Sequence, residues 1–248
     1  MEAFLEFLRS PWGIVLFTVV AVAIVLFFLA ANYRLFTKAV LDFIFGIVAI
    51  IVLSPSIIAS AIILKVKTGS VLQKHWIAGK GGKPVCVYTF IECEQNGRPC
   101  YINRSVINYF PLLFGVICGR LSLLGPLPVS LRDAALTGDE YDLRFAVRPG
   151  IISPALKHFG EFPEWEEMFA YECGYVKSRG LFRDAATVLV ILLRAVRGEG
   201  ARLLDFNRAG YADELLRSGK ITEEQIEEAE KIAEDEMLSV TRLKNRVG

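Results

Sequence analysis

An uncharged, apolar run from Trp12 to Ala31 constrains this chain more than any other feature. A helix needs about 20 apolar residues to cross the hydrocarbon core of a bilayer, and this run has that length. It is longer than the apolar core of a secretory signal, about 7–15 residues, and Ala-Ala-Asn at 30–32 only weakly resembles a cleavage site. We therefore expect a retained transmembrane anchor rather than a cleaved leader.

A second uncharged stretch, Phe43 to Leu64, has Ser54-Pro55 at its midpoint. Proline lacks a backbone donor and clashes with the preceding turn, so it kinks or breaks a helix. The segment either spans the bilayer with a kink or turns back as a re-entrant helix. The hydroxyls of Ser54 and Ser56 are available to satisfy backbone groups at such a break.

Basic residues lie on both sides of this second stretch. Arg34 and Lys38 precede it, whereas the N-terminal flank has Glu2, Glu6 and only Arg9. Lys/Arg-rich loops tend to face the cytoplasm, and a re-entrant segment has both flanks on that face. The charges thus favour one span, a re-entrant helix and a main domain on the cytoplasmic face of the inner membrane. The basic residues after the stretch are Lys65, Lys67, Lys74, Lys80 and Lys83.

The overall composition is typical of a soluble domain attached to a membrane. The mean hydropathy is +0.42, with 53% hydrophobic and 22% charged residues. The net charge of +1 gives no reason to expect nucleic acid as a partner. Five cysteines without a CxxC pair, and the distant His75 and His158, do not form a zinc pattern. We expect reduced cytosolic thiols and no metal site.

Beyond residue 70 the pattern mixes strands and helices, so the predicted fold class is α+β. A Gly-rich turn at 79–83 precedes the strand Pro84–Phe90, whose β-branched and aromatic residues suit a pleated surface. Helices are expected over Ser105–Cys118, Glu164–Tyr175 and Asp184–Val196. The predicted units are a transmembrane anchor (1–33), a re-entrant helix (34–69), a cytoplasmic domain with a small β-hairpin and amphipathic helices (70–200) and an acidic helical extension (201–248).

The last part of the chain predicts an acidic helix. Thr222 and Gln225 form a capping box at its start, and apolar residues then recur at helical spacing from Ile226 to Val240. The acidic remainder of this helix is either a solvated face or a surface that docks a partner protein.

Six short motifs follow one another from the second apolar stretch onward, and no single one is specific. They are Lys38 with Asp42, Ser54-Pro55, residues 79–84 with the strand Val87–Phe90, residues 119–128, Arg148–Ile151 and Tyr175-Val176. Their order, after a membrane helix with a Ser-Pro break, resembles the bacterial sugar transferases, the monotopic phosphoglycosyl transferases. The resemblance covers roughly Phe36 to Arg197.

The resemblance implies a re-entrant membrane helix and an active site at the cytoplasmic interface. Members of that family move a sugar-1-phosphate from a nucleotide diphosphosugar to a polyprenol phosphate. An aspartate attacks the phosphorus, a covalent phosphosugar intermediate forms, and UMP leaves when the donor is a UDP-sugar. A neighbouring glutamate and Mg²⁺ assist, because the phosphate charge must be offset.

The chain departs from the family at the residues that carry this chemistry. Counting back from Gly125-Pro126 without gaps places the family's Asp-Glu pair at Asn108 and Tyr109. An amide cannot become an anionic oxygen nucleophile, and a tyrosine does not replace a carboxylate on Mg²⁺ at neutral pH. Other site positions are also replaced, by Ile91, Arg120, Leu127 and Ile152. The backbone-shaping residues Gly125, Pro126, Pro128, Pro149 and Gly150 remain.

Other charged residues are candidates to replace some of the family's catalytic and phosphate-binding side chains. Asp139-Glu140 and Glu166-Glu167 are adjacent acidic pairs, which we interpret as charge at helix starts and on solvated helix faces. Arg148 is retained, either in a structural salt bridge or as a bidentate phosphate ligand. Further candidates for binding phosphate or lipid are Lys38, Lys80 and Lys83.

The sequence thus predicts a catalytically inactive family member that needs no cofactor. It would bind polyprenol phosphate, or an active phosphoglycosyl transferase or other glycan-assembly protein, at the membrane during glycan or polysaccharide assembly, and a homodimer is compatible with this role. One alternative is an active, Mg²⁺-dependent transferase with a rearranged site. The other is a structural anchor that recruits a partner through its C-terminal helix.

Overall fold

The computed structural model describes residues 10–95, 98–100, 102, 106–159, 163–196 and 210–247. The N-terminal flank and the predicted domain boundary near residue 200 lie outside these ranges. The described residues are mostly helical and carry small sheets, so the predicted α+β class is confirmed.

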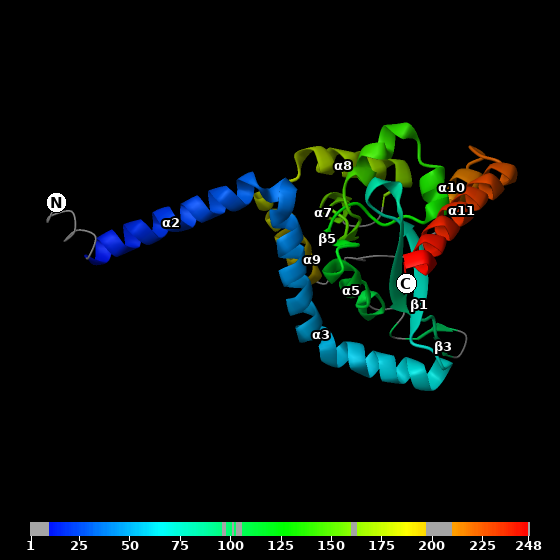
Figure 1. The fold of residues 1–248 in the computed structure, drawn as a ribbon, viewed down its shortest axis with the longest axis horizontal. Coiled ribbons are helices and arrows are strands. Elements are labelled where there is room, and N and C mark those ends of the chain that lie inside the picture. Colours follow the sequence, from blue (N-terminus) through cyan, green and yellow to red (C-terminus); the bar gives the residue numbers. More distant parts are fainter. Residues whose placement is uncertain are drawn as a thin grey trace.

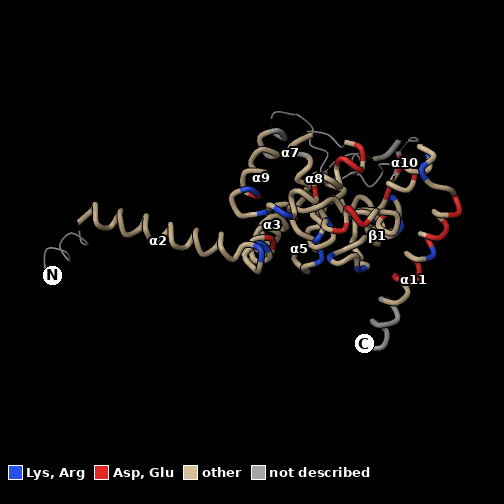
Figure 2. Tube along the Cα trace, turned by 90° about the horizontal axis from the view of Figure 1, so that it is seen from above, with Lys and Arg blue, Asp and Glu red and all other residues tan. Residues whose placement is uncertain are grey.

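Helix α2 (Pro11–Ala31) projects away from the remainder of the molecule (Figure 1). The Ser10 hydroxyl caps it by accepting from the Gly13 amide at 3.1 Å, and Pro11 occupies the first helical turn, where no amide donor is needed. The helix carries no Lys, Arg, Asp or Glu (Figure 2), and most of its apolar side chains are exposed. Its length and composition suffice to cross a membrane.

A short π-helical turn, Tyr33–Thr37, connects α2 to helix α3 (Lys38–Thr68). Together, residues 33–68 make the second segment that is long and apolar enough to cross a membrane. Helix α3 is bent near its middle (Figure 1), with Pro55 inside the helix. Proline removes the donor that would bond the Ile51 carbonyl, and the Ser54 hydroxyl donates to that carbonyl at 2.7 Å instead.

A β-hairpin follows α3 after the helix ends at Gly69. Strands β1 (Leu72–Ala78) and β2 (Pro84–Phe90) pair antiparallel, with His75 opposite Val87. The bounds of β2 match the predicted strand. The turn between them, as expected, needs glycine, because Gly81 and Gly82 have φ of 73° and 71°. A second, shorter hairpin joins β3 (Glu94–Gln95) and β4 (Arg98–Pro99).

Strands β5 (Ser122–Leu124) and β6 (Gly150–Ile152) form a parallel pair that the sequence analysis did not predict. The two strands belong to two of the motifs that carry the family resemblance. Gly125 and Gly150 lie where the backbones touch, and a Cβ on Gly150 would stand 2.1 Å from the Gly125 amide nitrogen. A side chain at either position would push the motifs apart, which explains why glycine is needed here.

The predicted helix Ser105–Cys118 is interrupted. A 3-10 turn, Val106–Tyr109, is followed by helix α5 (Leu112–Ile117), with Pro111 between them. Proline disfavours the helical conformation of the residue before it, so a single continuous helix was the wrong prediction. The predicted helices near 164–175 and 184–196 are confirmed as α8 (Trp165–Ser178) and α9 (Leu181–Val196).

The remaining helices surround one apolar core that contains Ile77, Val87, Leu121, Met168 and Phe169. They are α6 (Leu131–Ala135), a 3-10 turn at Asp139–Ala146, α7 (Ala155–Phe159), α10 (Tyr211–Arg217) and α11 (Glu223–Val247). The predicted capping box at Thr222 and Gln225 is present, with reciprocal bonds of 3.0 and 3.4 Å.

The C-terminal helices contribute to the same core. Tyr211 and Leu215 of α10 are buried in it, and Ala229 of α11 is 3% exposed. Arg132 of α6 forms ion pairs with Asp213 and Glu230 at 3.2 and 3.4 Å. Acidic residues recur along α11 (Figure 2), and they are exposed. The extension is therefore packed onto the domain through its apolar stripe.

Candidate functional site

The backbone around residues 125–128 is held by a buried ion pair. Arg144 and Glu172 are 2% and 0% exposed, and their charged groups are 2.8 Å apart. The Leu127 amide donates to Glu172 at 2.6 Å, and the Leu127 carbonyl accepts from Arg144 at 2.8 Å. Burial of unpaired charges is costly, so both groups depend on this arrangement. The pair fixes the Gly-Pro-Leu-Pro segment in place.

Asp42 connects α3 to the two glycine-containing motifs, residues 119–128 and Arg148–Ile151. Its carboxylate accepts from the Ser122 hydroxyl at 2.7 Å and from the Leu123 amide at 3.1 Å. Arg148 adds an ion pair at 3.3 Å. Asp42 is 5% exposed, so these three donors satisfy a carboxylate in the first turns of an apolar helix. The alternative interpretation of Arg148, a structural salt bridge, therefore matches its geometry.

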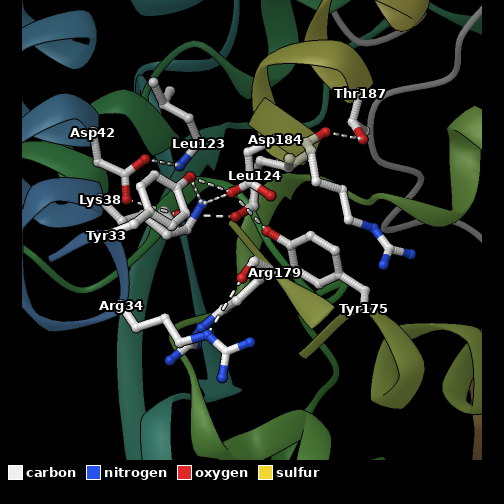
Figure 3. A network of polar contacts seen from close by, with 12 residues as sticks. Tyr33, Arg34, Lys38, Asp42, Leu123, Leu124, Tyr175, Arg179, Asp184 and Thr187 are labelled. Atoms are coloured by element: carbon white, nitrogen blue, oxygen red, sulfur yellow. Dashed lines mark hydrogen bonds and ion pairs between the residues drawn. The ribbon is translucent and has the colours of Figure 1, made fainter. Parts of the chain in front are cut away.

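Asp184 of α9 is the centre of a second polar network (Figure 3). One carboxylate oxygen accepts from Lys38 at 2.6 Å, from the Tyr175 hydroxyl at 2.9 Å and from the Tyr33 hydroxyl. Burial and the adjacent Asp184 charge raise the pKa of Tyr175, so the phenol keeps its proton and donates. The network ties the α2–α3 junction to α8 and α9.

Between these two networks lies a cavity of about 230 Å³, which we call the junction cavity. Five cationic side chains line it, and the two buried carboxylates, Asp42 and Asp184, adjoin it. The cations outnumber the carboxylates, so the cavity favours an anion. It lies where the apolar helices meet the domain. The cationic residues are Arg34, Lys38, Lys80, Arg148 and Arg179.

Three buried polar atoms of residues that line the junction cavity, or that neighbour its lining residues in the sequence or by a hydrogen bond, have no partner within the described part of the chain. They are the Thr37 hydroxyl, the Arg179 Nε and one oxygen, Oδ1, of Asp184. Buried polar groups are normally bonded to protein or to ordered water. Their gathering beside one cavity indicates a place where water or a polar ligand group would be bound.

The structure brings together three of the predicted phosphate-binding residues. Lys38, Lys80 and Arg148 all line the junction cavity, although they come from α3, the β1–β2 turn and the segment before β6. Lys83 is exposed and is not among the lining residues. Ser54 and Pro55 lie at the bend of α3. The predicted backbone-shaping residues Gly125, Pro126, Pro128, Pro149 and Gly150 are all buried.

The two dyad positions are not part of this cavity. Asn108 is 8% exposed and lies in the 3-10 turn before Pro111, and Tyr109 packs against the main core. Leu127 is buried. Arg120 donates to the Cys86 carbonyl at 3.1 Å. The replaced positions are thus occupied by packing residues or by side chains bonded within the domain.

The two adjacent acidic pairs lie on the outside of the domain. Asp139 and Glu140 are exposed at the start of a 3-10 turn. Glu167 is exposed, and Glu166 forms an ion pair with Lys220 at 2.6 Å. Among the described residues no group of three or more His, Cys, Asp and Glu side chains could hold a metal ion.

Sequence reasoning missed several residues of these networks. Asp184 was included only as the start of a predicted helix, and Arg34 only as a topological charge. Arg144 and Glu172 were not noticed, because a charged residue in a helix usually faces solvent. One signal was available for Asp184. It is an acidic residue in a helix whose following residues are almost all apolar, so its burial needed a cationic partner.

This protein thus combines apolar helices with an α+β domain. A cationic cavity lies where the two meet. Residues 94–198 match the family model described as bacterial sugar transferase. This part of the chain is therefore similar to the bacterial sugar transferases. Sequence relatives of the chain agree with that match. Together with the two apolar helices, they indicate a membrane protein.

One relative is an uncharacterized sugar transferase of Bacillus subtilis, 26% identical over 156 residues, which cover 56% of this chain and 76% of the relative. A second is the UDP-N-acetylgalactosamine-undecaprenyl-phosphate N-acetylgalactosaminephosphotransferase of Aeromonas hydrophila, 25% identical over 67% of this chain and 45% of the relative. A third is the UDP-glucose:undecaprenyl-phosphate glucose-1-phosphate transferase of Xanthomonas campestris pv. campestris, 26% identical over 69% of this chain and 40% of the relative. The matches span less than half the length of the latter two proteins.

Proposed function

We propose that this protein binds a polyprenol phosphate at the membrane and does not itself catalyse phosphosugar transfer. The observation that carries the proposal is the junction cavity, whose five cations adjoin apolar helices, while the dyad positions hold Asn108 and Tyr109. A polyprenol phosphate has an anionic head and an apolar tail. Two relatives are named for acting on undecaprenyl phosphate, and this chain would share the lipid partner.

The contacts of α3 support a re-entrant topology. Its first turns reach the domain through Lys38 and Asp42, and its last turns reach it through Leu64, which packs with Phe90. A straight helix of 31 residues would be roughly 46 Å long, longer than the hydrocarbon core is thick. A helix that spanned the bilayer would separate its ends, whereas a bent, re-entrant helix keeps both on the domain side. The domain would then lie on the cytoplasmic face.

The proposed inactivity follows from the chemistry of the replaced side chains. Transfer through a covalent intermediate needs an anionic oxygen, which neither the amide of Asn108 nor the neutral phenol of Tyr109 provides. Mg²⁺ prefers carboxylate oxygens, and these two residues supply none. The donor set at these positions therefore does not fit the metal of the family.

Lipid binding is tested with the full chain in lipid nanodiscs. Native mass spectrometry would compare retention of undecaprenyl phosphate with that of undecaprenol, which lacks the phosphate. We expect selective retention of the phosphate, and a loss of about tenfold on Lys80→Gln, since one charge-assisted contact is worth roughly 1.5–3 kcal/mol. Lys83→Gln removes the same charge three residues away, outside the cavity, and serves as the matched control.

Equal retention of both lipids, or equal losses for the two lysine variants, would contradict binding at the junction cavity. Inactivity needs a separate assay, in which UMP release is measured with undecaprenyl phosphate, Mg²⁺ and a panel of UDP-sugars. We expect no release above a protein-free control. UMP release by the unsubstituted chain that is lost in the Arg148→Ala variant would contradict the proposal that the protein is inactive.

An active transferase with a rearranged site is the second candidate, and one observation favours it. Asp184 is 5% exposed and adjoins the junction cavity, and its Oδ1 is without a partner within the described residues. A carboxylate oxygen that is not engaged in a hydrogen bond could attack a phosphorus atom. This candidate predicts a covalent phosphosugar adduct on the peptide that contains Asp184. Peptide mapping after incubation with UDP-sugars would detect it, and its absence with every donor would count against this candidate.

The third possibility, a structural anchor that acts through its C-terminal helix, has less support. Helix α11 uses Ala229, Ala233 and Met237 to pack onto the domain, so only its acidic face is left to meet a partner. An active phosphoglycosyl transferase or a second copy of this chain remains a predicted partner. Co-purification from membranes with and without residues 210–248 would separate this role from lipid binding.

A further inference from the structure

Two of the five cysteines lie opposite each other at the base of the β3–β4 hairpin. Glu94 is paired with Pro99, so the next pair outward is Cys93 and Cys100. The Cys100 amide donates to the Cys93 carbonyl at 2.7 Å, which extends the ladder by one step. We propose that Cys93 and Cys100 are a modification site and form a reversible disulfide that closes this hairpin.

The backbone already has the spacing that such a bond requires. Residues directly opposite each other in an antiparallel pair have Cα atoms about 4.5–5.5 Å apart. Disulfides join Cα atoms about 4.4–6.8 Å apart. The two thiols also interact with each other, and burial together with this interaction raises the pKa of Cys93. The register of the two strands thus matches the Cα spacing that a disulfide requires.

Both cysteines belong to one small apolar cluster. Cys93 and Cys100 are 5% and 6% exposed, and the cluster includes Leu64 of α3, Phe90 of β2 and Ile102. The same packing that buries the thiols holds them side by side. The other three cysteines have different surroundings, because Cys118 is exposed and the Cys173 thiol donates to the Tyr141 carbonyl at 3.5 Å, while Cys86 lies within β2.

The oxidation needs a two-electron oxidant, and a peroxide is the class we name. One thiolate attacks a peroxide oxygen, the O–O bond breaks, and a sulfenic acid and water result. The second thiol then displaces the hydroxyl as water and forms the S–S bond. Two thiols and one hydrogen peroxide thus give one disulfide and two waters. Thiolates are the attacking species, so oxidation should accelerate as pH rises.

The location gives the bond a structural consequence. The cluster joins the end of α3 to Ile107, which stands next to Asn108. A disulfide would fix the hairpin between these two segments. Cytosolic disulfides are usually transient, so the reduced form would be the resting state of a cytoplasmic domain. The inference does not depend on the proposed lipid binding.

The test uses the full chain in nanodiscs, reduced and then treated with hydrogen peroxide. Free thiols are blocked with a maleimide, and the protein is analysed by intact mass and by non-reducing peptide mapping. We expect the five thiols of the reduced chain to fall to three. A linked peptide pair containing Cys93 and Cys100 should appear, and dithiothreitol should restore all five labels.

Cys118→Ser is the matched control and should keep the linked pair, whereas Cys93→Ser and Cys100→Ser should lose it. Five labelled thiols after peroxide would overturn the proposal, as would linkage through Cys118 or irreversible oxidation of Cys93 without linkage. Peptide mapping of the unsubstituted chain decides the question even if a serine variant does not fold.

Discussion

Two polar regions of this protein differ in the side chains that they contain. The junction between α2, α3 and α9 keeps buried charges that are paired across long sequence distances, with Lys38 bonded to Asp184 and Arg148 to Asp42. The segment at 106–109, where we predict the position of the family's catalytic pair, has an amide at Asn108 and a phenol at Tyr109. The junction adjoins the glycine- and proline-rich segments 119–128 and 148–151, which we call the frame.

The difference teaches that the frame does not depend on the catalytic groups. The Leu127 backbone is fixed by Arg144 and Glu172, and the close approach of Gly125 and Gly150 depends on the absence of side chains. None of these contacts uses a carboxylate at 108 or 109. The proposed inactive role is therefore compatible with an intact cavity beside the apolar helices.

The largest effect is expected from Glu172→Gln. Arg144 would remain buried with its charge uncompensated, and breaking such a pair typically costs about 3–5 kcal/mol. Chemical unfolding of the detergent-solubilised chain would measure the loss. Glu166→Gln removes an exposed partner of Lys220 and should change the free energy of unfolding by less than about 1 kcal/mol. Similar losses for the two variants would show that the frame is not held by the Arg144–Glu172 pair.

A smaller loss is expected from Asp184→Asn. The variant keeps the shape of the side chain but removes the charge that Lys38 and two tyrosine hydroxyls meet, which should cost roughly 1–3 kcal/mol. Lys38 is 17% exposed and can turn partly to water, so the loss should be less than for Glu172. A double-mutant cycle with Lys38→Met would isolate the pair. Additive effects would mean that the junction is held by packing alone.

Much of the fold could be predicted because its signals are local. The apolar run of α2, the proline in α3, the strand at 84–90 and the capping box at Thr222 each depend on a few neighbouring residues. The break before α5 could also have been found, because Pro111 restricts Phe110. The predicted continuous helix ignored that local signal.

The networks of the site could not be predicted in the same way. Asp184 meets Lys38 across 146 positions, and Asp42 meets Arg148 across 106. No spacing rule connects such residues, and only the fold brings them together. The resemblance to a family pointed to Lys38, Asp42 and Arg148, which belong to its motifs. It did not point to the Arg144–Glu172 pair, which holds the backbone of Leu127 by hydrogen bonds.

Restoring the catalytic pair would sharpen the comparison. Asn108→Asp combined with Tyr109→Glu should give no UMP release, because we predict that Ile91, Leu127 and Ile152 occupy other site positions of the family. We expect a stability loss of roughly 1 kcal/mol, since Asn108 is 8% exposed and a carboxylate is harder to bury than an amide. The release assay in nanodiscs checks the first point. Measurable release would mean that the dyad alone had been missing.

The smallest effect concerns pH and lies outside both polar regions. His75 of β1 bonds to the Thr89 hydroxyl at 2.8 Å, and burial lowers the pKa of the imidazole below its ordinary value. The unfolded chain then binds a proton more readily than the folded one, so the contribution of His75 is present above about pH 6.5 and is lost as pH falls through that value.

His75→Gln removes this titration while keeping a side chain that can bond Thr89. Melting curves between pH 8 and pH 5 should show the unsubstituted chain losing stability more steeply than the variant as pH falls. The two proteins differ only at position 75, so the difference between their melting curves reports on His75 alone. Parallel curves would mean that His75 remains hydrated enough to protonate in place.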